Sequence, residues 1–242
     1  MIKIKIEDLY KSFNSQDVLK GVDLEIEKGC TLVILGASGS GKSVLLKHII
    51  GLLTPDSGNV YIDDRNLFRL SRKELNALRT HFGMLFQGAA LFDSMNVYEN
   101  ITLGLTEHTN MLDDEKREVA AEKLRLVGLE GIEHKFPAEL SGGMKKRVGL
   151  ARAICMDPEI VLYDEPTTGL DPMSADTIND LILELNNRLS ITSIAVTHDL
   201  YSAFKIGDRF AMLAQGKICF VGTKEEIQST DNEYIREFLS HV

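Results

Sequence analysis

Apolar and polar residues alternate through the N-terminal part of the chain, from Met1 to about Ile62. Ile2, Ile4 and Ile6 alternate with polar neighbours, and residues 22–26 repeat the pattern. A period of two is typical of strands with one buried face. The N-terminal part is therefore expected to be rich in strands.

A short continuous apolar run follows at Thr31–Leu35, which predicts a fully buried strand. The apolar residues after Ser43 predict a helix that ends near Leu53. Pro55 and Gly58 then mark a turn. The order strand, short loop, helix is the first sign of an α/β unit.

Between about Gly88 and Met156 the chain becomes helical and charged. Residues 113–127 space their apolar side chains for one face of a helix, and their glutamates and lysines are expected to form a solvated outer face. From Glu159 onward strands and helices alternate again. The predicted elements are strand 160–163, helix 172–189, strand 191–197, the strands 209–214 and 217–221 joined by a hairpin at Gln215-Gly216, and a short helix at 233–240.

This order predicts one domain with an α/β core and a smaller helical lobe. The core is expected to comprise residues 1–87 and 157–242, with the lobe inserted at 88–156.

Composition and charge narrow the class of protein. The chain has 242 residues, of which 44% are hydrophobic and 26% charged, and its formal net charge is −9. That composition is ordinary for a globular protein, and the acidic balance disfavours a nucleic-acid partner. No apolar run approaches the roughly 20 residues of a membrane span, and the 3 cysteines are scattered. We expect a cytosolic, reduced protein without its own membrane anchor.

The segment Gly36-Ala-Ser-Gly-Ser-Gly-Lys-Ser43 fits a phosphate-binding loop between strand and helix. Its glycines let consecutive N–H groups point at an anion, and the following helix adds its positive end. Lys42 would reach the β- and γ-phosphates and Ser43 would bind Mg²⁺. The alternative is a flexible glycine-serine turn, against which the flanking elements argue. The residues predicted to surround the phosphates are Gly36, Ser38, Gly39, Ser40, Gly41, Lys42, Ser43 and Val44.

A second acidic site is expected where Ile160-Val-Leu-Tyr-Asp-Glu165 ends an apolar run in two carboxylates. A buried parallel strand could deliver such acids to a Mg²⁺ site. Asp164 is the better metal ligand, and Glu165 is the better base to orient an attacking water. The alternative is a strand followed by an acidic turn, because Pro166 comes next.

The stretch Glu139-Leu-Ser-Gly-Gly-Met-Lys-Lys-Arg147 resembles the signature motif of ABC transporter ATPases, in which Gln is usual where Met144 stands. Ser141, Gly142 and Gly143 are expected to open a helix that runs to about Met156, a second anion-ready helix end. In the family each ATP lies between the phosphate loop of one subunit and the signature of the other. The resemblance therefore implies a homodimer that binds ATP and Mg²⁺.

Further motifs of the family occur in order along essentially the whole chain. The resemblance implies that Phe13 stacks on adenine, although Tyr10 competes for that role, and that Gln87 lies near Mg²⁺ and the attacking water. It also implies that Asp171 contacts the partner subunit and that His198 senses the γ-phosphate. Taken singly, these residues have ordinary roles as a core aromatic, a surface amide, a helix N-cap and a structural histidine.

The implied fold is a P-loop NTPase core with an N-terminal antiparallel β subdomain and an inserted α-helical subdomain. Residues 85–100, 140–147 and 202–209 resemble the ATPase of Mla-type (Mce-associated) lipid transport systems. An integral-membrane permease is expected to dock near residues 87–100. Phe92, Met95 and Tyr98 could form its apolar socket, or could pack the helical lobe.

The sequence thus predicts an ATPase subunit that moves phospholipid between membranes, peripheral on the cytoplasmic face of the inner membrane through its permease. A Mce-type lipid-binding protein and a small cytosolic regulator are further candidate partners. The alternatives are a subunit for another cargo and a soluble ABC ATPase outside transport. For the last of these, Lys145-Lys-Arg147 could form a local nucleic-acid patch, or could lie exposed or pair with acids on the helix after the signature.

Overall fold

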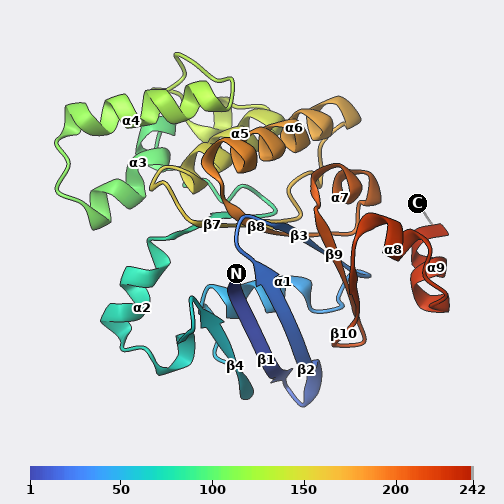
Figure 1. The fold of residues 1–242 in the computed structure, drawn as a ribbon. Coiled ribbons are helices and arrows are strands. Elements are labelled where there is room, and N and C mark those ends of the chain that lie inside the picture. The colour runs from blue at the N-terminus through green and yellow to red at the C-terminus, as the bar shows by residue number, and fades with distance from the viewer. Residues whose placement is uncertain (241–242) are drawn as a thin grey trace. The chain divides into compact units, whose positions relative to one another are not determined.

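Residues 1–240 are described by the computed structural model, and they group into two units. The first unit comprises Met1–Arg79 together with the segment from Thr192 onward, and the second comprises Thr80–Ile191. Figure 1 follows the chain through both by colour.

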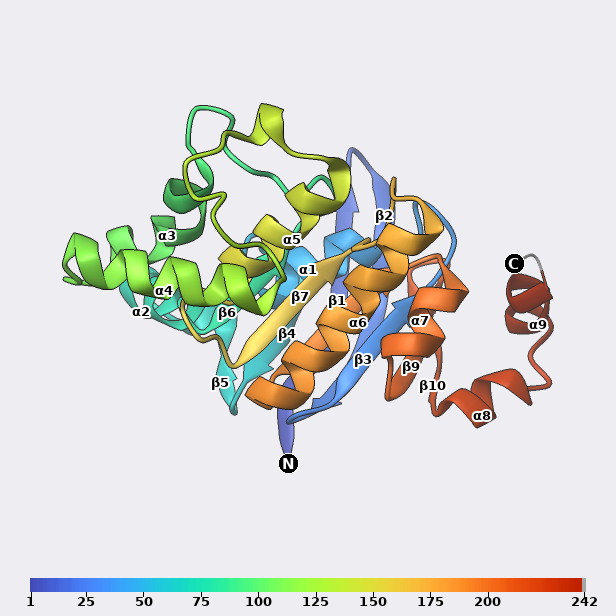
Figure 2. The ribbon, with the colours of Figure 1, turned by 90° about the horizontal axis from the view of Figure 1, so that it is seen from above.

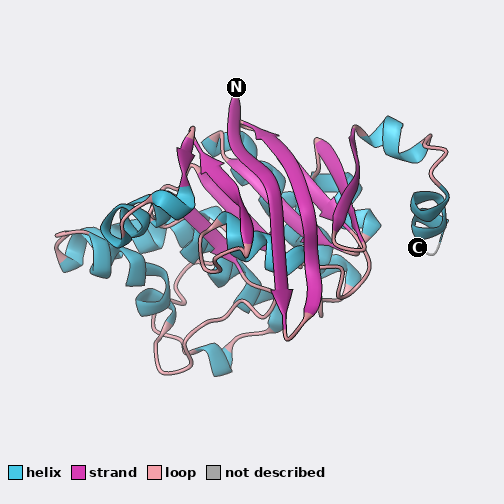
Figure 3. Cartoon of the chain, turned by 90° about the horizontal axis from the view of Figure 1, so that it is seen from below, coloured by secondary structure: helices cyan, strands magenta, loops and turns pink. Residues whose placement is uncertain are grey.

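In the first unit, the alternating N-terminal segment forms long antiparallel strands. β1 (Ile2–Phe13) pairs with β2 (Gln16–Glu27) on one side and with β4 (Ser57–Ile62) on the other, and β4 pairs with β5 (Arg65–Asn66). The paired strands are the long magenta arrows of Figure 3. The expected strand-rich N-terminus and antiparallel sheet are confirmed.

The first unit also holds parallel strands. β3 (Thr31–Leu35) lies between β8 (Thr192–Thr197) and β9 (Arg209–Ala214), parallel to both, and β9 continues antiparallel into β10 (Lys217–Gly222). Every residue of β3 and β8 is buried, which explains their continuous apolar character. The other elements of this unit are α1 (Lys42–Ile49), η1 (Leu67–Arg69), α2 (Arg72–Arg79), α7 (Leu200–Ile206), α8 (Lys224–Gln228) and α9 (Glu233–Ser240).

The second unit is built on a parallel pair of strands, β6 (Phe82–Leu85) and β7 (Ile160–Asp164). The helix α6 (Pro172–Leu189) runs along β7 in Figure 2, and the buried Tyr163 hydroxyl lies 3.1 Å from Asn186 Oδ1 of that helix. The predicted helical segment 88–156 lies within this unit. Its helices are α3 (Val97–His108), α4 (Asp113–Leu126), η2 (Pro137–Glu139) and α5 (Gly142–Ala153).

Several element ends differ from the predictions by one residue or a few. The helix predicted to reach Leu53 ends at Ile49, because Gly51 adopts a left-handed φ of +69° and terminates it. The signature helix ends at Ala153 and not at Met156, since Asp157 turns with φ +48° directly before Pro158. The strand predicted from Ile191 begins at Thr192, because the Ile191 N–H donates to Asn186 and closes α6.

Candidate active site

The predicted phosphate loop leaves β3 at Gly36 and enters α1 at Lys42. A Cβ atom added at Gly36 would lie 2.4 Å from the carbonyl oxygen of Leu213, so a larger residue would collide with β9. Gly41 has a φ of +104°, a conformation that residues with a Cβ rarely adopt. The glycines therefore occur where the backbone requires them, as the motif predicted.

Lys42 is folded into this loop. Its side chain is buried, and Nζ donates to the carbonyl oxygens of Gly36 at 2.7 Å and Ala37 at 3.1 Å. Beside it, the buried Oγ of Ser40 has no hydrogen-bond partner among the described residues. Buried polar atoms are normally paired, so an orphan hydroxyl in a glycine-rich turn fits a loop that closes around a polar ligand.

Phe13 and Tyr10 both lie on β1, and the structure separates their surroundings. Phe13 is 41% exposed at the end of the strand, where Lys11 Nζ lies 5.4 Å from its ring centroid. Tyr10 is engaged with its own sheet, since a Cβ added at Gly21 would lie 2.8 Å from the Tyr10 hydroxyl. The two side chains are almost equally exposed, at 41% for Phe13 and 40% for Tyr10, so only the close approach of the Tyr10 hydroxyl to Gly21 distinguishes them.

His198 follows the buried strand β8 and is exposed. The turn on which it sits is fixed by its neighbours. The Asp199 N–H donates to Thr197 Oγ1 at 3.0 Å, and Asp199 Oδ1 accepts from the Tyr201 N–H at 3.1 Å as the cap of α7. The histidine is thus held at the carboxyl end of a parallel strand, where ligands of α/β sheets usually bind.

In the second unit, Asp164 and Glu165 end the strand β7 as predicted and are both buried. Glu165 has a φ of +49°, a left-handed conformation that is strained for a residue with a side chain and stands directly before Pro166. Its Oε2 accepts a hydrogen bond from Thr168 Oγ1 at 3.2 Å. Strained backbone of this kind is concentrated at functional sites.

Gln87 lies near the same edge of this unit as Glu165. Leu85 of β6 pairs with Tyr163 of β7 in a parallel ladder, and Gln87 and Glu165 each follow two residues after their strand partner. The Gln87 side chain is exposed. The structure therefore brings these predicted residues to the same end of neighbouring strands.

Between them lies Lys146 of α5, a residue that the sequence analysis did not assign to the site. It is buried, and Nζ donates to the carbonyl oxygens of Gln87 at 2.5 Å and Glu165 at 3.1 Å. Burial lowers the pKa of Lys146 to about 8, an effect that the carboxylates of Asp164 and Glu165 oppose. Of the alternatives considered for Lys145-Lys-Arg147, an exposed patch does not include its central residue, because Lys146 is buried.

The signature residues open α5 in the expected way. Ser141 caps the helix, and its Oγ accepts from the Met144 N–H at 3.3 Å. Asp171 likewise caps α6 ahead of Pro172, and a hydrogen bond from Ser174 lowers the pKa of its carboxyl group. Both predicted caps are confirmed.

The segment expected to dock a permease is held from inside by Asn100. The buried Asn100 side chain accepts from the Phe92 N–H at 2.8 Å and donates to the carbonyl oxygens of Phe92, Met95 and Asn96. Phe92 is 50% exposed. Tyr98 is engaged within the unit, with its hydroxyl donating to Asp113 at 2.6 Å and Arg117 lying over its ring. Of the three socket residues, Phe92 is the one presented outward.

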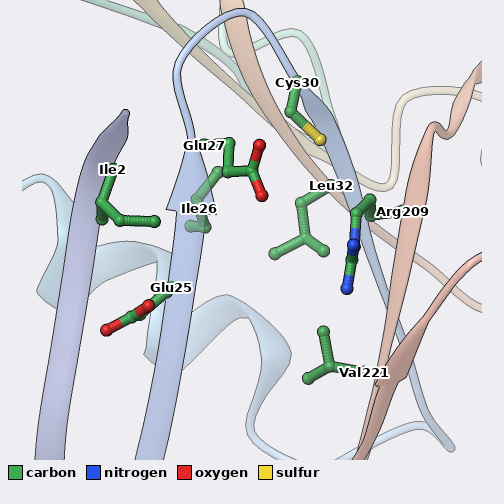
Figure 4. Close-up of a pocket in the computed structure, with 8 residues that line it drawn as sticks. All are labelled: Ile2, Glu25, Ile26, Glu27, Cys30, Leu32, Arg209 and Val221. Carbon is green, nitrogen blue, oxygen red and sulfur yellow. The ribbon is translucent and has the colours of Figure 1, made fainter.

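A cavity of about 250 Å³ lies elsewhere in the first unit. Figure 4 shows Glu27 and Arg209 at its wall, close to Cys30. Burial, with the charge of Asp208, raises the pKa of the Cys30 thiol to about 11, so the sulfur remains a protonated, weak nucleophile at neutral pH. None of the predicted site residues lines this cavity.

The described residues contain no cluster of three or more His, Cys, Asp or Glu that could hold a metal ion. The predicted Mg²⁺ ligands are of mixed type, a hydroxyl, an amide and a carboxylate from Ser43, Gln87 and Asp164. Within residues 1–240, no helix has the length and apolar character needed to cross a membrane.

Comparisons with known proteins show the family to which the chain is similar. The family model described as ABC transporter matches residues 19–168. A probable ribonucleotide transport ATP-binding protein of Mycobacterium leprae is 44% identical over 239 residues, which cover 99% of this chain and 69% of that protein. The intermembrane phospholipid transport ATP-binding protein MlaF of Haemophilus influenzae is 38% identical over 236 residues, covering 98% of this chain and 89% of that protein.

Among solved structures, a dimeric ATP-binding cassette in a post-hydrolysis state, bound to ADP and Pi, matches with a TM-score of 0.83 and 34% identity. The match covers 91% of this chain and 98% of that one.

Proposed function

Because the chain belongs to the ABC transporter family and so hydrolyses ATP, we propose that it is the subunit whose hydrolysis powers the movement of phospholipid between membranes. The observation that carries this proposal is the phosphate loop with its buried Lys42 and orphan Ser40 hydroxyl, together with the likeness to MlaF.

The loop from Gly36 to Ser43 would bind the phosphates. Its backbone N–H groups and the N-terminus of α1 offer donors to an anion, and Val44 lies in the first turn of that helix. Lys42 would exchange its two carbonyl acceptors for phosphate oxygens. Ser38 and Ser40 would supply hydroxyl donors, and Phe13 would stack on the base.

The residues proposed for hydrolysis are the Mg²⁺ ligands, the base and the switch histidine. Ser43, Gln87 and Asp164 would hold Mg²⁺, which neutralises charge on the phosphates when bound. Glu165 orients and polarises the attacking water, and its hydrogen bond from Thr168 fixes the carboxylate. His198 donates to the γ-phosphate. Positioning and electrostatic stabilisation account for most catalysis of this type.

The second anion-ready helix end supports a shared site between two copies of the chain. Ser141, Gly142 and Gly143 at the start of α5 would complete the nucleotide site of a partner copy, with Asp171 at the interface between them. The solved relative is a dimer with ADP and Pi, which favours this arrangement.

A membrane permease is proposed to dock on residues 87–100. The exposed Phe92 is the apolar anchor, and Asn100 holds the loop that presents it. A Mce-type lipid-binding protein and a small cytosolic regulator would complete the assembly, which places the chain on the cytoplasmic face of the inner membrane.

A second candidate cargo is ribonucleotide, because one relative carries that description in its name. Purification of the full chain from its native membrane in mild detergent, followed by mass spectrometry, distinguishes the candidates. A multi-span permease together with a single-span lipid-binding protein would support lipid transport. Ribosomal or DNA-repair proteins in place of a permease would overturn the transport assignment.

A further inference from the structure

We infer that Lys146 is a positioning residue for hydrolysis, which ties the signature helix α5 to the backbone of both Gln87 and Glu165. This inference rests on the proposed roles of those two residues. Lys146 itself touches neither nucleotide nor water in this account, and it acts through the backbone atoms that it holds.

The contacts explain why a lysine is needed at this position. Its ammonium carries three donors and no acceptor, and two of them reach carbonyl oxygens that belong to different strand ends. An apolar side chain would leave the Gln87 carbonyl without this donor. The Glu165 carbonyl, which also accepts from the Thr168 N–H at 3.3 Å, would lose its charged donor.

The backbone carbonyls that accept hydrogen bonds from α5 include those of residues with a left-handed φ. Arg152, on the same helix, donates to the carbonyl oxygens of Ala89 at 2.6 Å and Ala90 at 2.7 Å. Ala89, Ala90 and Glu165 all have a left-handed φ, of +60°, +47° and +49°. Cationic side chains of a single helix therefore brace three strained residues.

Close packing reinforces the brace. A Cβ added at Gly149 of α5 would lie 2.9 Å from Leu85 Cδ1 and 3.2 Å from Ala89 Cβ, so the helix lies directly against β6 and the segment after it. A shift of α5 would be transmitted to Gln87 and Glu165 together, because Lys146 spans both. The signature helix and the hydrolytic residues of one chain are thus mechanically coupled.

The competing explanation is that Lys146 only stabilises the fold, as any buried charged group with partners can. Lys123 provides a matched control for that explanation. It is another buried lysine of the second unit, and its Nζ donates to Asp157 Oδ1 at 2.6 Å without contact to Gln87 or Glu165. Lys123→Met measures what the loss of a buried, paired lysine does to the unit as a whole.

Amide hydrogen exchange on the nucleotide-free full chain tests the brace without any need for activity. In Lys146→Met, exchange should accelerate by about tenfold in peptides covering 86–92 and 165–170 and remain unchanged in α4. In Lys123→Met these two segments should exchange at the wild-type rate. Unchanged exchange in Lys146→Met, or equal acceleration in both variants, would overturn the inference.

ATP hydrolysis by the same full-length preparations gives the second readout. Lys146→Met should lower kcat by about tenfold or more with KM for Mg-ATP changed by less than about threefold, because nucleotide binding is left intact. Lys146→Arg should recover most of kcat, since its planar fork can donate to two carbonyls. If the wild-type chain hydrolyses ATP and Glu165→Gln does not, the proposed catalytic role of Glu165 is supported. A kcat near the wild-type value in Lys146→Met would contradict the positioning role of Lys146 and leave the role of Glu165 intact.

Discussion

Leu85 of β6 and Tyr163 of β7 are partners in a parallel ladder, and each stands two residues before a residue of the predicted catalytic set. Because the carboxyl ends of paired parallel strands lie at the same edge, this register places Gln87 and Glu165 at the same end of the strand pair. The chemistry proposed for the second unit depends on this register.

Glu165→Gln should lower the turnover of ATP by about 100-fold or more, because an amide cannot take up the proton of the attacking water. The substitution preserves side-chain volume, so nucleotide affinity should be retained. Steady-state phosphate release and binding of a fluorescent ATP analogue measure the two effects. Glu159→Gln, at the exposed start of the same strand region, is the matched control and should hydrolyse ATP normally. Near-normal turnover in Glu165→Gln would remove the residue from the role of base.

Phe13→Ala should weaken nucleotide binding by about tenfold, since an aromatic stack on a base is worth about 1–3 kcal/mol. Tyr10→Ala serves as the comparison, because Tyr10 is exposed to a similar degree but its hydroxyl lies against Gly21. Titration with the same ATP analogue decides between them. If Tyr10→Ala weakens binding and Phe13→Ala does not, the stacking residue has been assigned wrongly.

Ser141→Arg should block hydrolysis while each chain still binds ATP, because the bulky cation would obstruct the start of α5 where a partner's nucleotide is proposed to lie. Ser141→Ala is the control, because it removes the same capping hydroxyl without adding a bulky side chain. Thermal unfolding of this variant measures how much stability the loss of the cap alone removes. Size-exclusion chromatography with Mg-ATP reports the dimer. Unchanged hydrolysis in Ser141→Arg would contradict the shared site.

Phe92→Ala should reduce copurification of the membrane permease by several-fold and leave ATP binding unchanged. The reason is that half of the Phe92 surface is exposed, on a loop that Asn100 holds in place. Phe136→Ala is a matched control, because Phe136 is also an exposed aromatic of the second unit but lies outside residues 87–100. Equal loss of the permease in both variants would place the docking surface elsewhere.

Much of the fold could be predicted from residue pattern alone. The continuous apolar run Thr31–Leu35 and the helix Pro172–Leu189 match the predicted bounds, because full burial and a Pro at the first helical position leave strong local signals. The end of α1 was missed because the left-handed turn at Gly51 competes with an apolar pattern that continues to Leu53.

The role of Lys146 could not be predicted from the residue pattern of the sequence. A run of basic residues is usually a solvated surface, and the acceptors of Lys146 are backbone carbonyls, which carry no sequence signature. One signal was available. Gly149 and Leu150 lie three and four residues further along the helix, and this spacing places Lys146 on the buried face.

Phospholipid transfer between reconstituted membranes shows whether ATP hydrolysis by this chain moves lipid. The full chain, with the permease that copurifies, would be placed in vesicles that contain a fluorescent phospholipid, and transfer to acceptor vesicles would be followed on addition of Mg-ATP. Transfer should require ATP and should be abolished by Glu165→Gln. Hydrolysis that proceeds with no movement of lipid, while labelled ribonucleotide crosses the membrane, would contradict the proposal of lipid transport.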